Sequence, residues 1–341
     1  MKILFYSIII FSYCFGDNNF QSTTPLYLSK YSNALSFNVI PDTLRMVGIM
    51  SQFPIEIPDN PKTSGNGNFL STLDSNYFYN TSIPRCEGFL VDRPPHNSLY
   101  FIKQFEAAGN YYKTISNDKL PYSAKIIESD SLNGYYTVSN EMEYYAQSDQ
   151  HLAEFFTETL LLAKNDLETY LIDSDLLPSD IIIVVFHAGL SQDFAYPGID
   201  PTIYDLKSAY VDQNMVGENQ PAYILNDPIY NGIILPEVQN IIYYDVVEDI
   251  FGNPDYGTEN LCDIQVGLTG IFCFLLGYHL GLPEMFDTST GKPGIGYFGL
   301  MDYGSNNGRG VIPAPPSPWT RNLPDLTWSN IETLLPLDNL D

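Results

Sequence analysis

One stretch of the chain, residues 263–305, gathers side chains whose types and spacing could support metal chemistry. An apolar run within it leads to His279, Gly281 and Glu284, so an imidazole and a carboxylate flank a glycine. Both side chains are of the kinds that bind Zn²⁺ in proteins, and a glycine between them can end a helix and let the chain reverse. This stretch is therefore the first place to look for a functional site.

A helical zinc site of the His-Glu-x-x-His type needs two imidazoles one turn apart and a glutamate beside them as general base. Aligned on Leu280-Gly-Leu-Pro283, the chain has Phe274 and Tyr278 at the imidazole positions and Leu275 at the general-base position. A phenyl ring has no lone pair for a metal, and a phenol with a pKa near ~10 must first lose its proton. We therefore expect no catalytic residue in this block.

The block resembles the metal-site region of the immune inhibitor A group, a family of secreted zinc metallopeptidases with a metzincin-like fold. A weaker likeness extends upstream, so that the resemblance covers most of residues 44–340. The residues that carry it are Gly277, Leu280-Gly-Leu-Pro283, Glu284, Phe286-Asp287, the run from Gly299 to Gly304, and Pro315 to Trp319.

The resemblance implies an α/β fold of the metzincin-like kind, with a twisted mixed sheet, long helices and a Met-turn at Met301. It places Glu284 at the position of the third, carboxylate ligand, where the family has Asp. Family activity is zinc-dependent hydrolysis of peptide bonds, but the residues at both imidazole positions and at the general base differ here. The resemblance therefore implies a family member that has lost its zinc.

His279 is a possible substitute ligand. It lies one residue past the second imidazole position, so a regular helix rotates its side chain away by about 100°. A local slip could bring it round to Glu284 or Asp287, and His187, at the end of an expected strand, could join it. Otherwise His279 is a hydrogen-bonded structural residue, and the three replaced residues fill the metal pocket with apolar and aromatic volume.

The charge of the chain also limits its partners. With 15 basic and 41 acidic side chains, the formal net charge is −26. This field opposes binding to nucleic acid and to anionic membranes, and it favours solubility and cation binding. Calcium is a possible ligand of the acidic side chains, although the EF-hand pattern is absent.

The N-terminus has one basic residue, Lys2, followed by an apolar run to Phe15, which predicts a secretory signal peptide over residues 1–16. We expect a secreted, periplasmic or extracellular protein with no stable membrane insertion after cleavage. Residues 17–43 would be an extended lead-in. The sequence leaves the pairing of the remaining cysteines open; they are Cys86, Cys262 and Cys273.

Residues 44–341 form the expected metallopeptidase-like domain. Its sheet and helices would span 44–263, its modified active-site helix and Met-turn 264–305, and a C-terminal segment 306–341. Apolar periodicity predicts helices over 97–116, 150–172 and 264–282. Strands are expected at Arg45–Met50, at Tyr122–Glu128 and Tyr135–Val138 as a hairpin, at Ile181–Phe186 as a central strand, at Tyr223–Leu225 and at Ile233–Glu237. His96 and His151 receive no role.

Three functions follow from these observations. The first is a secreted, catalytically inactive peptidase homologue that keeps a cleft for a peptide or protein partner. The second is an active zinc endopeptidase with a non-standard ligand set that includes His279 and His187. The third is an acidic extracellular calcium-binding or surface protein that uses the fold only as a scaffold.

Overall fold

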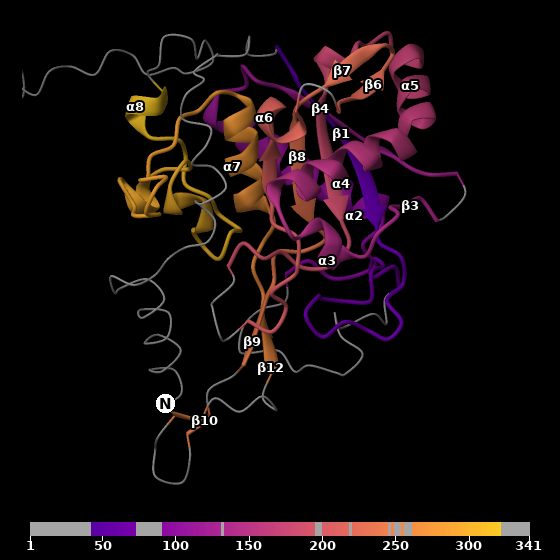
Figure 1. Ribbon diagram of the computed structural model, residues 1–341. Helices are drawn as coiled ribbons and strands as arrows, with labels where there is room; N and C mark the ends of the chain where they lie inside the picture. Colours follow the sequence, from indigo (N-terminus) through magenta and orange to yellow (C-terminus); the bar gives the residue numbers. More distant parts are fainter. Residues whose placement is uncertain are drawn as a thin grey trace, which may run out of the picture.

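The computed structural model describes residues 42–72, 91–130, 133–194, 200–217, 220–244, 247–248, 254–255 and 261–321 (Figure 1). The expected signal peptide, nearly all of the lead-in, Cys86 and residues 322–341 lie outside this part of the chain. Cys273 is buried and carries a free thiol. Within the described residues, no helix is long and apolar enough to cross a membrane.

The described residues form a mixed α/β fold. Its strands are β1 (Leu44–Gln52), β2 (Tyr122–Ile127), β3 (Tyr136–Thr137), β4 (Ile182–His187), β5 (Ala209–Val211), β6 (Ala222–Ile224), β7 (Asp227–Ile229), β8 (Gly232–Pro236), β9 (Ile241–Tyr244), β10 (Val247–Glu248), β11 (Pro254–Asp255) and β12 (Leu261–Ile264). Its α-helices are α2 (Ser98–Ile115), α3 (Met142–Tyr145), α4 (Asp149–Leu162), α5 (Lys164–Asp173), α6 (Gln213–Val216), α7 (Thr269–His279) and α8 (Pro318–Arg321). Its 3-10 helices are η2 (Pro178–Asp180), η3 (Gly296–Phe298) and η4 (Tyr303–Asn306).

The main sheet has six strands in the order β2-β1-β4-β8-β5, with β3 also paired to β1. Strand β5 is antiparallel to β8, whereas the other pairings are parallel, so the sheet is mixed as expected. The continuous apolar run of β4 is buried along its whole length, which confirms a central strand. Strands β9 and β12 form a separate antiparallel ribbon that extends away from the sheet (Figure 1).

The expected hairpin between β2 and β3 is wrong. Both strands pair in parallel with β1, β2 along its first part and β3 at Ser51 and Gln52. Because β1 is longer than β2, it offers more backbone groups for pairing beyond the end of β2. The chain leaves β2, closes a turn through the Ser129–Gly134 bridge, and continues along the same edge in the same direction.

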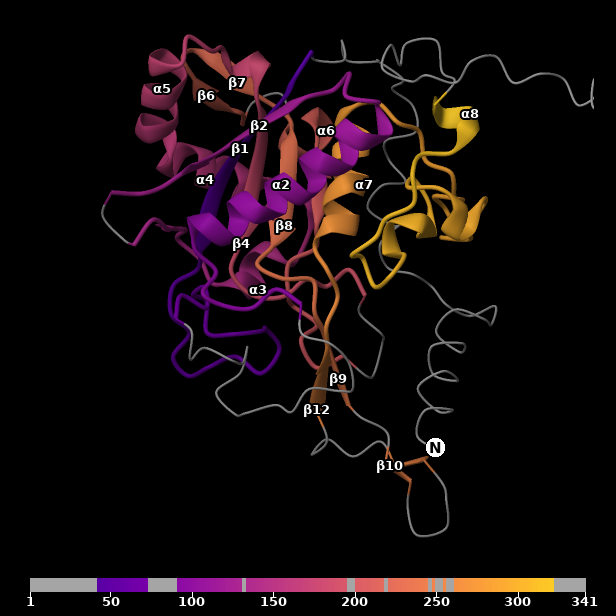
Figure 2. The same cartoon turned by 180° about the vertical axis from the view of Figure 1, so that it is seen from behind.

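Helices cover both faces of the sheet (Figures 1 and 2). On one face, Phe186 of β4 contacts Phe105 of α2 and Phe272 of α7, with ring centroids 5.5 Å and 6.2 Å apart. On the other face, the next residue, His187, packs against Phe155 of α4, with centroids 6.3 Å apart. Since successive side chains of a strand alternate in direction, α7 and α4 lie on opposite sides of the sheet.

Two expected helices have different bounds in the structure. The helix expected at 150–172 is divided at Ala163 into α4 and α5, and this turn keeps Leu160 and Leu167 fully buried on either side of it. The helix expected at 264–282 is shorter, because residue 264 belongs to β12 and Gly281, at a φ of 76°, follows the end of α7. The helix expected at 97–116 is confirmed as α2, which Asn97 caps.

A buried ion pair joins the loops at the carboxyl-terminal edge of the sheet. Nδ1 of His96 lies 2.5 Å from Oε1 of Glu237, and the two side chains are 1% and 0% exposed. The Glu237 carboxylate also accepts hydrogen bonds from the backbone N–H groups of Leu70 and Gly189, at 2.7 Å and 3.0 Å. Nε2 of His96 donates to the carbonyl of Asp92 at 3.1 Å. Both ring nitrogens therefore face acceptors, which favours the imidazolium form.

The pKa of His96 reflects these contacts. Burial lowers it, but the charge and hydrogen bond of Glu237 and the carbonyl of Asp92 raise it by more, so the net pKa lies above the usual value. His96 thus holds its proton in the folded chain at a pH where the unfolded chain releases it.

We expect Glu237→Gln to lower the free energy of unfolding by about 3–5 kcal/mol, because it leaves a buried imidazolium without its counter-charge. Urea denaturation near pH ~6.5, the pKa of an unperturbed histidine, measures the loss. The control is Glu106→Gln, which removes an exposed ion pair with Lys103 at 2.7 Å. That change should cost at most about 1 kcal/mol, and equal losses in both variants would contradict the assignment.

The stability should also depend on pH through His96. A raised folded-state pKa gives stabilisation that is complete below about pH 6.5 and is lost as the pH rises through the folded pKa. Between about pH 6.5 and 8, the urea midpoint of the wild type should therefore fall more steeply than that of His96→Gln. Burial lowers the pKa of His187 and His279 to about 4, so these two residues titrate on the acid side of this window. Parallel slopes for the two proteins would refute the prediction.

Candidate functional site

The residues at the expected ligand positions meet at the carboxyl-terminal end of α7. Phe274 and Tyr278 lie one turn apart on this helix, and their rings contact edge to face with centroids 5.1 Å apart. Glu284 follows the helix and is half-buried. Burial raises the pKa of the Glu284 carboxyl, and the nearby Tyr278 hydroxyl partly offsets this rise. The fold thus brings both imidazole positions and the third-ligand position to one place.

Aromatic side chains from two other segments surround this place. Tyr210 of β5 lies nearly parallel to Tyr278, with centroids 6.4 Å apart, and Phe286 lies nearly parallel to Phe274, with centroids 6.3 Å apart. Tyr210 could not have been found from the sequence, because no pattern links it to the distant helix α7. Phe286 belongs to the motif block, but nothing in its spacing indicated a contact with Phe274.

The side chains at the end of α7 offer too few donor atoms for a catalytic zinc ion. The general-base position, Leu275, is 1% exposed and belongs to the hydrophobic core. Phe274 is 4% exposed and offers only carbon atoms. One carboxylate and one phenol would remain as donors, whereas catalytic zinc uses three protein ligands and a water. Within the described residues, no three His, Cys, Asp or Glu side chains are grouped so that they could hold a metal ion.

Met301 packs against α7 at Gly277. Its side chain is 1% exposed, and its sulfur would come within 2.5 Å of a Cβ atom placed on Gly277. The carbonyl of Met301 accepts a hydrogen bond from the N–H of Met285 at 2.9 Å, which ties this turn to the segment that carries Glu284. Tyr112 of α2 donates to the carbonyl of Cys273 at 2.6 Å and fixes the helix from the other side.

The two candidate substitute histidines are not brought together. His279 is near Tyr210, with ring centroids 6.1 Å apart, and its Nδ1 is buried without a hydrogen-bond partner in the described structure. His187 lies on the face of the sheet that α4 covers, and its Nδ1 is 2.9 Å from the carbonyl of Ala188. Since α7 covers the other face, these two imidazoles are not placed to share a metal ion.

Two aspartates of the motif block support turns. Asp287, an expected partner of His279, is exposed. It accepts hydrogen bonds from Ser289 and Thr290, and these bonds lower its pKa to about 2. Asp302 is 2% exposed, and one of its oxygens accepts from three successive N–H groups, those of residues 294–296, at 2.8–2.9 Å. Asp302 thus fixes the loop next to Met301, a role that the sequence did not reveal.

Other buried acidic residues also have structural partners. Asp205 accepts a hydrogen bond from the N–H of Ser64 at 2.6 Å, and Asp193 accepts from the N–H of Ser208 at 2.9 Å and from the amide of Gln239 at 2.8 Å. Burial raises the pKa of both carboxyls. These carboxylates hold loops at the edge of the sheet.

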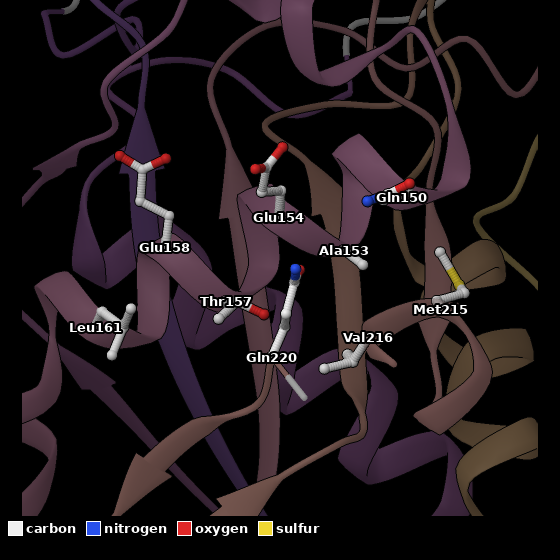
Figure 3. A pocket seen from close by; sticks show the side chains of 9 residues that line it. All are labelled: Gln150, Ala153, Glu154, Thr157, Glu158, Leu161, Met215, Val216 and Gln220. Carbon is white, nitrogen blue, oxygen red and sulfur yellow. The ribbon is translucent and has the colours of Figure 1, made fainter. Parts of the chain in front are cut away.

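A cavity of about 140 Å³ lies elsewhere, between α4 and α6 (Figure 3). Apolar side chains such as Ala153 and Val216 line it together with Glu154 and Glu158. The two carboxylates already accept hydrogen bonds from the hydroxyls of Tyr144 and Tyr145, at 2.9 Å and 2.5 Å. The cavity is therefore separate from the ligand positions on α7 and is not the cleft that the sequence led us to expect.

Compared with known protein families, curated proteins and solved structures, the chain shows no match.

The close packing around α7 predicts unequal effects of two glycine substitutions. A Cβ atom at Gly270 would lie 2.0 Å from the backbone oxygen of Ser305, whereas at Gly277 the nearest atom is the end of the flexible Met301 side chain. We expect Gly277→Ala to cost about 1–3 kcal/mol of unfolding free energy and Gly270→Ala to cost more, because backbone yields less readily. Urea denaturation of both variants tests this order. The reverse order would show that the segment with Met301 and Ser305 does not pack against α7 as described.

Proposed function

We propose that this chain is a non-catalytic relative of the secreted zinc metallopeptidases that its motif block resembles, and that it binds a peptide or protein partner without cleaving it. The supporting observation is the grouping of Phe274, Tyr278 and Glu284 above Met301. We infer that this grouping corresponds to the frame of a metzincin-like zinc site with a Met-turn at Met301, in which a phenyl ring and a phenol stand at the imidazole positions.

The chemistry of the grouped residues supports binding over hydrolysis. Cleavage of a peptide bond by a zinc enzyme needs a metal to polarise the carbonyl and a base to take a proton from the attacking water. Leu275 cannot act as a base, and it is buried in the core. The partly exposed side chains of Tyr278 and Phe286 instead provide apolar area, which suits contact with a peptide.

The other two functions have less support. An endopeptidase that uses His279 and His187 together would need side chains from opposite faces of the sheet. A calcium protein would need a cluster of oxygen ligands, and the described residues contain no such group of acidic side chains. Export from the cell remains part of the proposal and rests on the N-terminal sequence alone.

The direct test is metal analysis of purified protein together with a casein-cleavage assay. We expect substoichiometric zinc and no cleavage that a chelator abolishes, because the donor set is incomplete. Near-stoichiometric zinc with chelator-sensitive cleavage would overturn the proposal.

A gain-of-function test checks the alignment of the block. In the double variant Phe274→His with Tyr278→His, two imidazoles and Glu284 should bind zinc, and the core residue Leu275 is left in place. The triple variant, which also carries Leu275→Glu, adds a general base and should show some cleavage if it folds. Absence of zinc from a folded double variant would mean that these positions do not correspond to metal ligands.

A further inference from the structure

The cavity between α4 and α6 is lined by apolar and by acidic side chains (Figure 3). Its volume is about 140 Å³. Sites for cofactors and drug-sized ligands have about 300–1,000 Å³, so this cavity can hold a group of the size of one amino-acid side chain. It lies on the face of the sheet that α4 covers, whereas α7 covers the other face. The cavity is therefore distinct from the site of the proposed function.

The apolar part of the lining comes from both helices. Ala153 of α4 and Val216 of α6 are buried, and Met215 is partly buried. Leu161, in the last turn of α4, also lines the cavity and is exposed. Apolar surface therefore continues from the inside of the cavity to the solvent. An aliphatic chain that lies along these side chains would remove its own hydrocarbon and theirs from water.

Two glutamates give the cavity a negative charge. Glu154 and Glu158 lie one turn apart on α4, and their carboxyl groups extend to the same side of the helix (Figure 3). Like charges at this spacing repel each other. Helix α4 contains no lysine or arginine, and none of the ion pairs among the described residues includes either glutamate. Within the described part of the chain, no cation balances these two carboxylates.

Uncharged donors hold the two carboxylates in place. One oxygen of Glu154 accepts a hydrogen bond from the hydroxyl of Tyr144 at 2.9 Å. Both oxygens of Glu158 are acceptors: one bonds the N–H and the hydroxyl of Ser139, at 2.7 Å and 2.6 Å, and the other bonds the hydroxyl of Tyr145 at 2.5 Å. These donors position the carboxylates without neutralising them. Acceptors that are fixed before binding lose less conformational entropy when a ligand arrives.

We propose that this cavity binds a primary ammonium group at the end of a short aliphatic chain, as in a lysine side chain or a free alkylamine. An ammonium group has three donors and can bond both carboxylates, while its chain lies against Val216 and Leu161. A guanidinium group fits less well, because its planar fork needs two acceptors on one carboxylate, and the oxygens of Glu158 already accept three hydrogen bonds. The net charge of −26 favours the approach of a cation.

The test is an NMR titration of the full chain, isotope-labelled at its methionine methyl groups, with n-butylamine and with Nα-acetyl-lysine amide. Both probes should shift the signal of Met215, which lines the cavity, and leave that of Met301, beside α7, unchanged. n-Butanol has the same chain without the charge and should bind at least about tenfold more weakly, because the charge-assisted hydrogen bonds are lost. Nα-acetyl-arginine amide should bind more weakly than the lysine amide. Tighter binding of the lysine amide than of n-butylamine identifies a peptide or protein lysine as the source, and the reverse order identifies a free amine.

Three variants locate the site. Glu154→Gln should weaken the binding of n-butylamine about tenfold or more. This variant should keep its fold, because Glu154 is exposed and a glutamine can still accept from Tyr144, and its melting temperature checks this. Leu161→Ala should weaken binding about two- to fivefold through lost apolar contact. The matched control is Glu106→Gln, which removes the same charge from α2 and should leave binding unchanged.

Several results would overturn the inference: no shift of the Met215 signal, an equal shift of the Met301 signal, equal binding of n-butanol or of the arginine amide, or equal losses in the Glu154 and Glu106 variants. None of these results bears on the proposed function, because that function concerns residues on the other face of the sheet. Zinc-dependent cleavage of casein, in turn, would remove the proposed function and leave the amine site standing.

Discussion

The buried pair of His96 and Glu237 holds together the parts of the chain that the site needs. A single carboxylate binds the imidazole of the segment before α2, the N–H of Leu70 and the N–H of Gly189, which follows β4. Glu237 itself follows the end of β8. Loops from four distant parts of the sequence thus meet at one carboxylate. Each contact gives a hydrogen-bond partner to a buried backbone or side-chain group that would otherwise have none.

Helix α2 links the buried pair of His96 and Glu237 to α7. The hydroxyl of Tyr100, in the first turn of α2, donates to the carbonyl of Glu237 at 3.0 Å. Further along α2, Tyr111 and Tyr112 donate to the carbonyls of Ala314 and Cys273, each at 2.6 Å. One helix therefore connects the edge of the sheet with α7 and with the loop beyond Met301. The placement of Phe274 and Tyr278 depends on hydrogen bonds that no local pattern of α7 contains.

The periodic elements could be predicted from the sequence, and the long-range contacts could not. The apolar run of β4 and the spacing of the apolar residues in α2 gave the correct element types, because burial imposes a period on the side chains. The partners of β2 and β3 were wrong, since alternation shows which face of a strand is buried but not which strand lies beside it. The sequence predicts no role for His96, because its partner, Glu237, is remote in sequence. At the candidate site, the motif block singled out Phe274, Tyr278 and Glu284, and their correspondence to ligand positions stays a prediction. The contacts of Tyr210 and Asp302 could not be predicted from that block.

The aromatic cluster at the end of α7 has a consequence for how the protein reaches its native state. In a metalloprotein, the bound ion stabilises the folded state that brings its ligands together. The folded fraction therefore depends on the metal concentration and decreases when a chelator is added. Here Phe274 and Tyr278 contact each other through carbon atoms, and the contacts exist as soon as the chain folds. On the proposed loss of zinc, these ring contacts and the hydrogen bond from Tyr112 to Cys273 hold the helix, and the folded fraction should not decrease when a chelator is added.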